Sequence, residues 1–160
     1  MSPKPGRKNR TRKIEKVQKK GNTRTKTKKT NKRKPQVVMC PYCGGRSEYT
    51  SSREVYHGKD YGMIYLCRPC EAYVGCHQGT AIPLGRLANA ELRSAKMEAH
   101  RMFDPLWKDG DMNRHNAYAW LARELGLPTR YCHIGMFDVD QCQKVVEACV
   151  SLVNKKFRES

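Results

Sequence analysis

Large apolar residues are distributed very unevenly along the chain. Residues 1–35 contain only Met1, Ile14 and Val17 as large apolar side chains. Too few apolar groups are present in this segment to offset the entropy that is lost when a backbone becomes ordered. The pattern therefore predicts that residues 1–35 are disordered in the free protein and that folded structure begins after them.

Residues 36–82 have a different pattern, in which short apolar runs alternate with turn residues. An apolar run at 37–39 leads into the sequence CPYCGG, and the run MIYLC at 63–67 follows the turn-forming sequence HGKDYG. Short runs of this kind, bounded by glycine and aspartate, are typical of strands joined by tight turns. We predict a strand, a turn and a second strand, with one pair of cysteines at each end.

Residues 83–160 show helical periodicity. Apolar residues recur there at steps of three and four, which places them on one face of a helix. The stripes consist of Leu92, Ala95, Ala99, Met102 and Leu106; of Ala117, Trp120, Leu121 and Leu125; and of Cys142, Val145, Val146, Cys149, Leu152 and Val153. We therefore predict three helices in this region.

Local signals indicate where these helices begin and end. Pro105 is expected to end or bend the first helix, because proline cannot donate the backbone hydrogen bond that a helix interior requires. Gly126, with Pro128 just beyond it, is typical of a C-terminal cap for the second helix. Asp138 and Gln141 have the spacing of a capping box at the start of the third.

The cysteine pairs add candidate metal ligands to this picture. Cys40 and Cys43 form one C-x2-C pair and Cys67 and Cys70 form another, with 23 residues between the pairs. Two such turns flanking a hairpin bring four thiolates to the corners of a tetrahedron, the arrangement that structural zinc prefers. We predict one structural Zn2+ on these cysteines, which would stabilise a hairpin too small to bury a core of its own.

Cys76 and His77 follow the second pair closely and leave two alternatives open. Either residue is near enough in the sequence to replace one thiolate. Otherwise Cys76 packs as a small apolar residue and His77 makes an ordinary hydrogen bond. Cys132, Cys142 and Cys149 fall on or near apolar helix stripes, so we expect them to pack in the core.

This organisation predicts a fold of the α+β class with three segments. A small zinc ribbon over residues 36–82 packs on a three-helix module over residues 83–160, and the two are expected to form one compact unit. A disordered Lys/Arg-rich tail over residues 1–35 precedes them.

Charge is concentrated in the tail. Residues 1–35 hold 16 Lys and Arg and a single acid, whereas residues 36–160 hold 16 Lys and Arg and 14 acids. Basic side chains interleaved with Thr, Asn and Gln bind phosphate without reading sequence. We predict that the tail contacts nucleic acid through Lys4, Arg7, Lys8, Arg10, Arg12, Lys13, Lys16, Lys19, Lys20, Arg24, Lys26, Lys28, Lys29, Lys32, Arg33 and Lys34. A solubilising or targeting tail, or one that binds an acidic protein, is the alternative.

The ribbon offers further contacts for nucleic acid. Its basic residues include Arg46, Arg53, Lys59 and Arg68, and its tyrosines include Tyr49, Tyr56, Tyr61 and Tyr65. This mixture of charge and stacking groups is typical of proteins that bind single strands. The alternative is that the tyrosines pack the thin core of the ribbon.

Evidence for catalysis is weak. His100 and Asp104 stand four residues apart on the first predicted helix. Together with His77 they are candidate residues of a nuclease in which a histidine acts as the base. No second carboxylate stands at the spacing of a catalytic metal site, and no nucleotide-binding motif is present. We therefore favour a binding protein over an enzyme and keep a zinc-knuckle nuclease as an alternative.

Several ordered blocks of sequence resemble a known family. CPYCGG, YLCRPCEAYVGCH, PLGRLANAELR, AHRMFDPLW, AYAWLARELGLP and CHIGMFDVDQC together resemble a small zinc-finger family found mainly in bacteriophages and prophages, over roughly residues 38–153. The resemblance implies zinc ligation by the two cysteine pairs and nucleic-acid binding, with no established activity. The basic tail is not part of this pattern.

The resemblance also favours a phage protein that acts in the cytoplasm of a bacterial host. No run of about 18 apolar residues is present, so we expect no membrane span. The partner predicted is DNA or RNA. An adaptor that binds a host machine such as RNA polymerase or the ribosome is the alternative.

Overall fold

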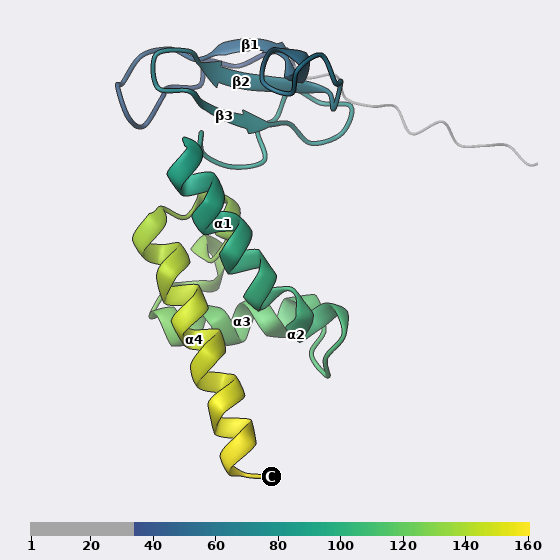
Figure 1. Cartoon of the computed structure of the whole chain (residues 1–160), viewed down its shortest axis with the longest axis vertical. Helices are drawn as coiled ribbons and strands as arrows, with labels where there is room; N and C mark the ends of the chain where they lie inside the picture. The colour runs from purple at the N-terminus through teal and green to yellow at the C-terminus, as the bar shows by residue number, and fades with distance from the viewer. Residues whose placement is uncertain (1–33) are drawn as a thin grey trace, which may run out of the picture.

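A small antiparallel sheet and a group of helices make up the part of the chain that the structure, a computed structural model, describes, residues 34–160. The sheet lies at one end of the molecule and the helices extend away from it (Figure 1). The fold is α+β, as the sequence predicts. The predicted disorder of residues 1–35 falls almost entirely outside the described residues.

The sheet consists of β1 (Glu48–Ser51), β2 (Met63–Cys67) and β3 (Ala72–Gly75), in the order β1-β2-β3. β2 lies in the middle and buries its last four residues. Its sequence is therefore a continuous apolar run and does not alternate, as in strands that are covered on both faces. In the pairing of β1 with β2, Tyr49 lies opposite Tyr65.

The third strand goes beyond the hairpin that the sequence predicts. β3 has only four residues and follows β2 directly across the tight turn that carries the second cysteine pair. The segment leading to the helices runs back along its outer edge, where Tyr73 pairs with Ala88 and Cys76 pairs with Pro83. A strand this short has too little alternation to be predicted from sequence, because its stability comes from neighbours on both sides.

The helices are α1 (Ala90–Phe103), α2 (Pro105–Lys108), α3 (Arg114–Leu125) and α4 (Val139–Arg158). Short 3-10 helices are η1 (Ser52–Glu54), η2 (Thr129–Tyr131) and η3 (Ile134–Met136). The three long helices are the predicted ones. α2 is a single turn that continues from α1 after the break at Pro105.

The predicted helix ends are present. Gly126 takes a left-handed conformation with a φ of 64° and closes α3, a geometry that glycine adopts without a Cβ penalty. At the start of α4, the Gln141 N–H donates to Asp138 Oδ1 at 2.8 Å, and the Asp138 N–H donates to Gln141 Oε1 at 3.1 Å. This reciprocal pair is the capping box expected from the spacing.

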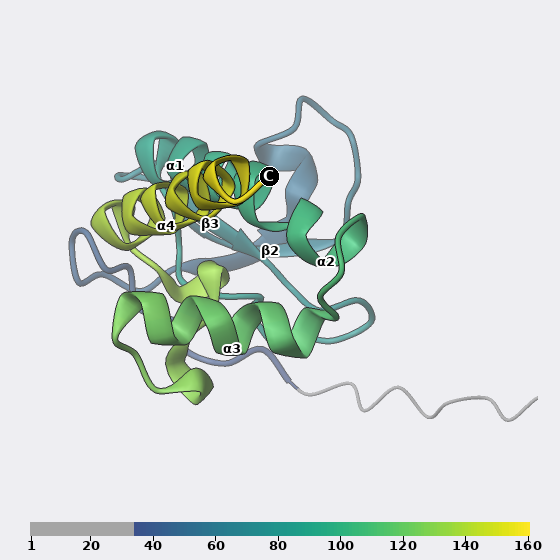
Figure 2. The same ribbon diagram turned by 90° about the horizontal axis from the view of Figure 1, so that it is seen from below.

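The helical module has a continuous apolar core. α1 and α4 lie side by side, and α3 packs across them (Figures 1 and 2). The buried residues are Ala88, Leu92, Ala99, Phe103, Ala117, Leu121, Ala122, Cys132, Ile134, Phe137, Cys142, Val145 and Cys149. Cys132, Cys142 and Cys149 thus pack in this core, as predicted. No helix within residues 34–160 is long and apolar enough to cross a membrane.

The ribbon joins the module through a small set of polar and backbone contacts. The Arg93 guanidinium in the first turn of α1 lies 4.2 Å from the centre of the Tyr73 ring and donates to the carbonyls of Ala88 at 2.7 Å and Glu71 at 3.1 Å. Gly85 approaches the backbone of Gly135 so closely that an added Cβ would collide with it. These contacts fix the start of α1 against β3.

Candidate metal centre and surrounding surfaces

The structure brings the four paired cysteines together at one end of the sheet. The sulfur atoms of Cys40, Cys43, Cys67 and Cys70, hereafter the cysteine cluster, all lie within 4.8 Å of one another. The Sγ atoms of Cys43 and Cys67 are 3.6 Å apart. A tetrahedral site with Zn–S bonds of about 2.3 Å has S–S edges of about 3.8 Å, so this separation fits a shared metal ion.

The first pair sits on a tight turn that the sequence around it makes possible. The Gly44 N–H donates to the Cys40 carbonyl at 2.9 Å, and the Cys40 N–H donates to the Gly45 carbonyl at 2.8 Å. Gly44 has a φ of 71°, which a residue without Cβ adopts at little cost. The Gly45 N–H also points at Cys43 Sγ, 3.4 Å away, and would stabilise negative charge on that sulfur.

The second pair occupies the turn between β2 and β3. Cys67 ends β2, and the Glu71 N–H donates to the Arg68 carbonyl at 3.2 Å to close the turn. Glu71 takes a left-handed conformation, with a φ of 49°. Because β2 is the central strand, it holds Cys67 rigidly, and Cys67 and Cys40 are the two buried members of the cluster.

Proximity separates the pKa values of the thiols. Burial opposes ionisation of Cys40, but hydrogen bonds from the backbone of Cys43 and Tyr42 and from neighbouring thiols outweigh it and lower its pKa to about 7. A hydrogen bond with Cys43, together with burial, raises the pKa of Cys70 to about 12. Neighbouring thiolates repel one another, so four of them coexist at neutral pH only when a cation compensates their charge. The donor set therefore suits a divalent ion that prefers thiolate.

A comparison with protein families identifies the domain. The family of zinc-finger-containing domains matches residues 36–151. The chain belongs to this family. The match includes the whole cysteine cluster, and the two findings together indicate that this zinc-finger domain binds zinc. No curated protein and no solved structure matches the chain.

The family match confirms the resemblance seen in the sequence and sets its limits. It begins at residue 36, so the basic tail lies outside the zinc-finger domain, and it ends at residue 151, inside α4. The phage origin that the resemblance favours stays a prediction.

Cys76 and His77 lie at the opposite end of the sheet from the cysteine cluster. β2 runs from Met63 to Cys67, and Gly75 pairs with Ile64 at the start of that strand. Three residues of strand, about 10 Å, therefore separate Cys76 from the cluster. Cys76 packs at the edge of the ribbon core, where burial raises the pKa of its thiol. The structure thus favours the packing alternative for Cys76.

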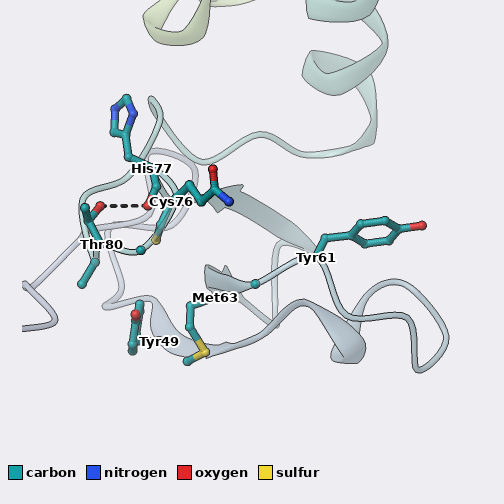
Figure 3. A pocket seen from close by; sticks show the side chains of 10 residues that line it. Tyr49, Tyr61, Met63, Cys76, His77 and Thr80 are labelled. Atoms are coloured by element: carbon teal, nitrogen blue, oxygen red, sulfur yellow. Dashed lines mark hydrogen bonds between the residues drawn. The ribbon is translucent and has the colours of Figure 1, made fainter. Parts of the chain in front are cut away.

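A hollow of about 660 Å³ lies beside Cys76 (Figure 3). Tyr49 and Met63 line it from the strands, and the loop from 76 to 81 lines it from the other side. Thr80 Oγ1 donates to the His77 carbonyl at 2.9 Å and accepts from the Ile82 N–H at 3.1 Å, which fixes the loop. The exposed His77 therefore belongs to the border of this hollow.

The basic residues predicted on the ribbon divide into two groups. Arg68 pairs with Glu48 at 2.9 Å and with Glu54 at 3.2 Å, and Arg53 pairs with Asp60 at 3.3 Å. Their charges are locally neutralised. Arg46 and Lys59 are exposed and form no ion pair within residues 34–160. The body of the ribbon therefore presents little net positive charge.

The predicted tyrosines also divide. Tyr65 is fully buried and donates through its hydroxyl to the Ala81 carbonyl at 2.7 Å, and the Tyr49 ring packs 5.1 Å from it. Tyr61, in contrast, is 70% exposed, and its ring lies 5.0 Å from that of the exposed Tyr56. Two of the four tyrosines thus form the ribbon core, and the other two form an exposed aromatic pair.

Tyr73 extends the exposed pair, and the sequence analysis did not select it. Its ring lies 5.8 Å from that of Tyr56, and its other neighbour is the Arg93 guanidinium. Tyr61, Tyr56, Tyr73 and Arg93 therefore form a row, hereafter the aromatic row, from the β1–β2 connection to the start of α1. β3, which carries Tyr73, has only four residues and no clear alternation, so the sequence held no signal that would have selected it.

The candidate catalytic residues do not converge. His100 Nδ1 lies 3.1 Å from Asp104 Oδ1, and Asp104 also pairs with Lys108 at 2.8 Å. His100 is in the last turn of α1, and Asp104 stands between α1 and α2, whereas His77 lies beside the sheet (Figure 3). The His100–Asp104 pair is an i, i+4 contact that supports the end of α1.

Proposed function

We propose that the protein binds nucleic acid and that one structural zinc ion maintains the ribbon that helps to do so. The observation that carries this proposal is the basic tail, in which 16 of the 32 Lys and Arg residues occur within 35 residues beside a single acid. A chain of this composition releases counterions from a polyanion, so it binds phosphate strongly and without sequence preference.

The cysteine cluster supports a structural role for the zinc. Four thiolates complete a tetrahedral shell and leave no open position for a substrate or a catalytic water. The ion would link the turn at Cys40 to the turn at Cys67 and so connect the start of the ribbon to the middle of its sheet. Its contribution is stability of the ribbon.

The aromatic row supplies contacts of another kind. Exposed tyrosine rings provide faces on which unpaired bases stack, and such stacking is tolerant of sequence. Because Arg53 and Arg68 are paired with acids, the ribbon has little charge of its own with which to bind phosphate. The two regions therefore have different roles: the tail attracts the phosphates electrostatically, and Tyr56 and Tyr61 contact the bases of a single strand.

Fluorescence anisotropy with labelled single-stranded DNA, single-stranded RNA and duplex DNA tests the proposal. If about 6–10 phosphates are neutralised, affinity of the full chain falls on the order of 10³–10⁵-fold between about 50 and 200 mM salt. Deletion of residues 1–35 should remove most of this salt dependence. The role of the tail is refuted if the full chain does not bind nucleic acid at low salt, or if the deletion leaves its affinity unchanged.

A double substitution of Tyr56 and Tyr61 by alanine separates the ribbon from the tail. We expect a loss of about 1–3 kcal/mol per stacked base for single strands, with little change for duplex DNA. Tyr131→Ala is the matched control, because Tyr131 is an exposed tyrosine that lies in η2 of the helical module and not in the aromatic row. Equal effects of the two variants would contradict the role of the aromatic row.

The alternative prediction, an adaptor for a host machine, gives a different result in the same experiment. An adaptor retains its protein partner after deletion of residues 1–35 and shows no measurable affinity for any of the three nucleic acids. The experiment therefore decides between the two functions.

A further inference from the structure

The C-terminal half of α4 projects beyond the rest of the helical module (Figure 1). α4 has 20 residues, but its buried residues, Cys142, Val145 and Cys149, all lie within its first 11. The other helices cover this part and leave the last turns uncovered (Figure 1). A helix normally continues only as far as its packing supports it, so an uncovered extension of this length calls for an explanation.

An apolar stripe runs from the middle of α4 into its uncovered last turns. Val146, Val150, Val153 and Phe157 recur at steps of four, three and four, which places them on one side of the helix. Val150 and Val153 are each 41% exposed and Phe157 is 79% exposed. The stripe lies next to the core-facing residues and continues beyond the point where the core ends. Such a row on a protruding helix is typical of a surface that packs on another helix.

Charge along α4 is divided between its two ends. The first half contains Asp140 and Glu147 with one base, Lys144, and Asp138 caps its start. The last turns contain Lys155, Lys156 and Arg158. A second α4 that runs in the opposite direction would bring its basic end beside the acidic half of the first, whereas a parallel partner would place like charges together.

We propose that the apolar stripe of α4 pairs in antiparallel fashion with the same stripe of a second copy of the chain. This inference does not depend on nucleic-acid binding. With the two-fold axis between positions 151 and 152, Val150 lies opposite Val153 of the second copy and Val146 lies opposite Phe157. In that register Glu147 and Arg158 lie on the same flank of the interface, about two residues apart along the helix axis, and form an ion pair in each half.

The length of the stripe sets the strength of the dimer. Eleven residue steps at 1.5 Å span about 17 Å of helix, so the interface belongs to the small class of protein contacts. A small interface dissociates readily, and we expect the monomer and the dimer to coexist at micromolar concentrations. The dimer carries two basic tails that emerge from separate ribbons.

Sedimentation velocity of the full, zinc-loaded chain from low to high micromolar concentration measures this association, after co-purified nucleic acid has been removed. We expect a concentration-dependent shift from monomer to dimer. Val153→Glu combined with Phe157→Glu should leave a monomer at every concentration, because both side chains lie on the stripe. Met97→Glu is the matched control, since Met97 is 73% exposed on α1 and should leave the dimer intact.

Charge reversal tests the antiparallel direction. Glu147→Arg and Arg158→Glu should each weaken the dimer several-fold, and the two changes on one chain should restore it. Circular dichroism of every variant establishes that α4 is still folded. The proposal is overturned if the wild-type chain is monomeric at every concentration or if the dimer persists in the Val153→Glu, Phe157→Glu variant. It is also overturned if the double charge reversal does not restore association.

Discussion

The ribbon and the helical module differ in the size and composition of their packed cores. Thirteen buried residues form the core of the module, and all of them are aliphatic residues, aromatic residues or cysteines that do not belong to the cysteine cluster. The main packed cluster of the ribbon has only five buried residues, and two of them are Cys40 and Cys67 of the cysteine cluster. We therefore expect burial of apolar surface to be sufficient for the module and the ribbon to depend on its cysteine cluster.

This contrast implies that the two regions can be unfolded separately. Both tryptophans of the chain, Trp107 and Trp120, belong to the helical module. Tryptophan fluorescence thus reports on the module alone, and limited proteolysis within residues 36–82 reports on the ribbon. Each of the following changes is directed at one region or at the junction between them.

Removal of the metal should have the largest effect. Structural zinc contributes apparent binding energies of about 10–16 kcal/mol to small domains, and the ribbon has too little apolar core to replace them. Chelation, or Cys43→Ser with Cys70→Ser, should therefore unfold the ribbon and make it sensitive to protease. The tryptophan fluorescence of the module should change little, and elemental analysis should show the metal bound to the wild type and lost from the variant.

Cys76→Ser is the matched control for this experiment. Cys76 is a ribbon cysteine outside the cluster, separated from it by the length of β2. It should keep the metal content of the wild type. A Cys43→Ser, Cys70→Ser variant that remained folded and protease-resistant in the ribbon would contradict the dependence of the ribbon on the cluster.

The opposite change should affect only the module. Phe103 is fully buried at the end of α1, with its ring 4.7 Å from that of Tyr118. Replacement by alanine leaves a cavity and should lower the free energy of unfolding by about 3–5 kcal/mol. Urea denaturation followed by tryptophan fluorescence measures this loss. Zinc content should be unchanged in the native state, and loss of the metal would show that the two regions are coupled more strongly than their separate cores indicate.

Much of the module could be predicted because its signals are local. The apolar stripe of each long helix repeats over two or more turns, and the caps at Gly126 and Asp138 act within a few residues of themselves. The two cysteine pairs could be predicted as metal ligands for the same reason. C-x2-C spacing is typical of a tight turn, and two such turns can place four sulfur atoms in a tetrahedral arrangement. Local chemistry sufficed in these places.

Sequence reasoning was less complete where a residue's role depends on a distant partner. Arg68 is one of four basic residues predicted on the ribbon surface, yet its charge is neutralised by Glu48 in β1 and Glu54 in η1. Tyr65 and Tyr61 are only four residues apart, yet one is buried in the centre of the sheet and the other is exposed. Strand pairing decides these outcomes, and a single sequence does not contain it.

An intermediate effect is expected at the junction of the two regions. Arg93 donates to carbonyls on both sides of it, at Glu71 in the ribbon and at Ala88 before α1. Arg93→Ala should lower stability by about 1–3 kcal/mol, because charged hydrogen bonds to carbonyls are lost. Backbone amides of β3 and of the first turn of α1 should exchange hydrogen faster in this variant than in the wild type. Arg101→Ala, on the exposed face of the same helix, is the control and should leave exchange at β3 unchanged.

The smallest effect should come from the end of α1, where the contribution of charge depends on pH. Burial raises the pKa of Asp104, but hydrogen bonds from Lys108 and His100 outweigh it and hold that pKa below its ordinary value of 3.8. A depressed pKa means that the ionised carboxylate stabilises the folded state above pH 3.8 and that this contribution is lost as the pH falls through the lower value. Asp104→Asn should therefore cost less than about 1 kcal/mol at neutral pH, and the two proteins should converge in acid. Release of zinc in acid affects both proteins equally, so the difference between their urea midpoints isolates Asp104. A difference that persists below the pKa of the carboxyl would show that packing, and not charge, is what Asp104 contributes to the module.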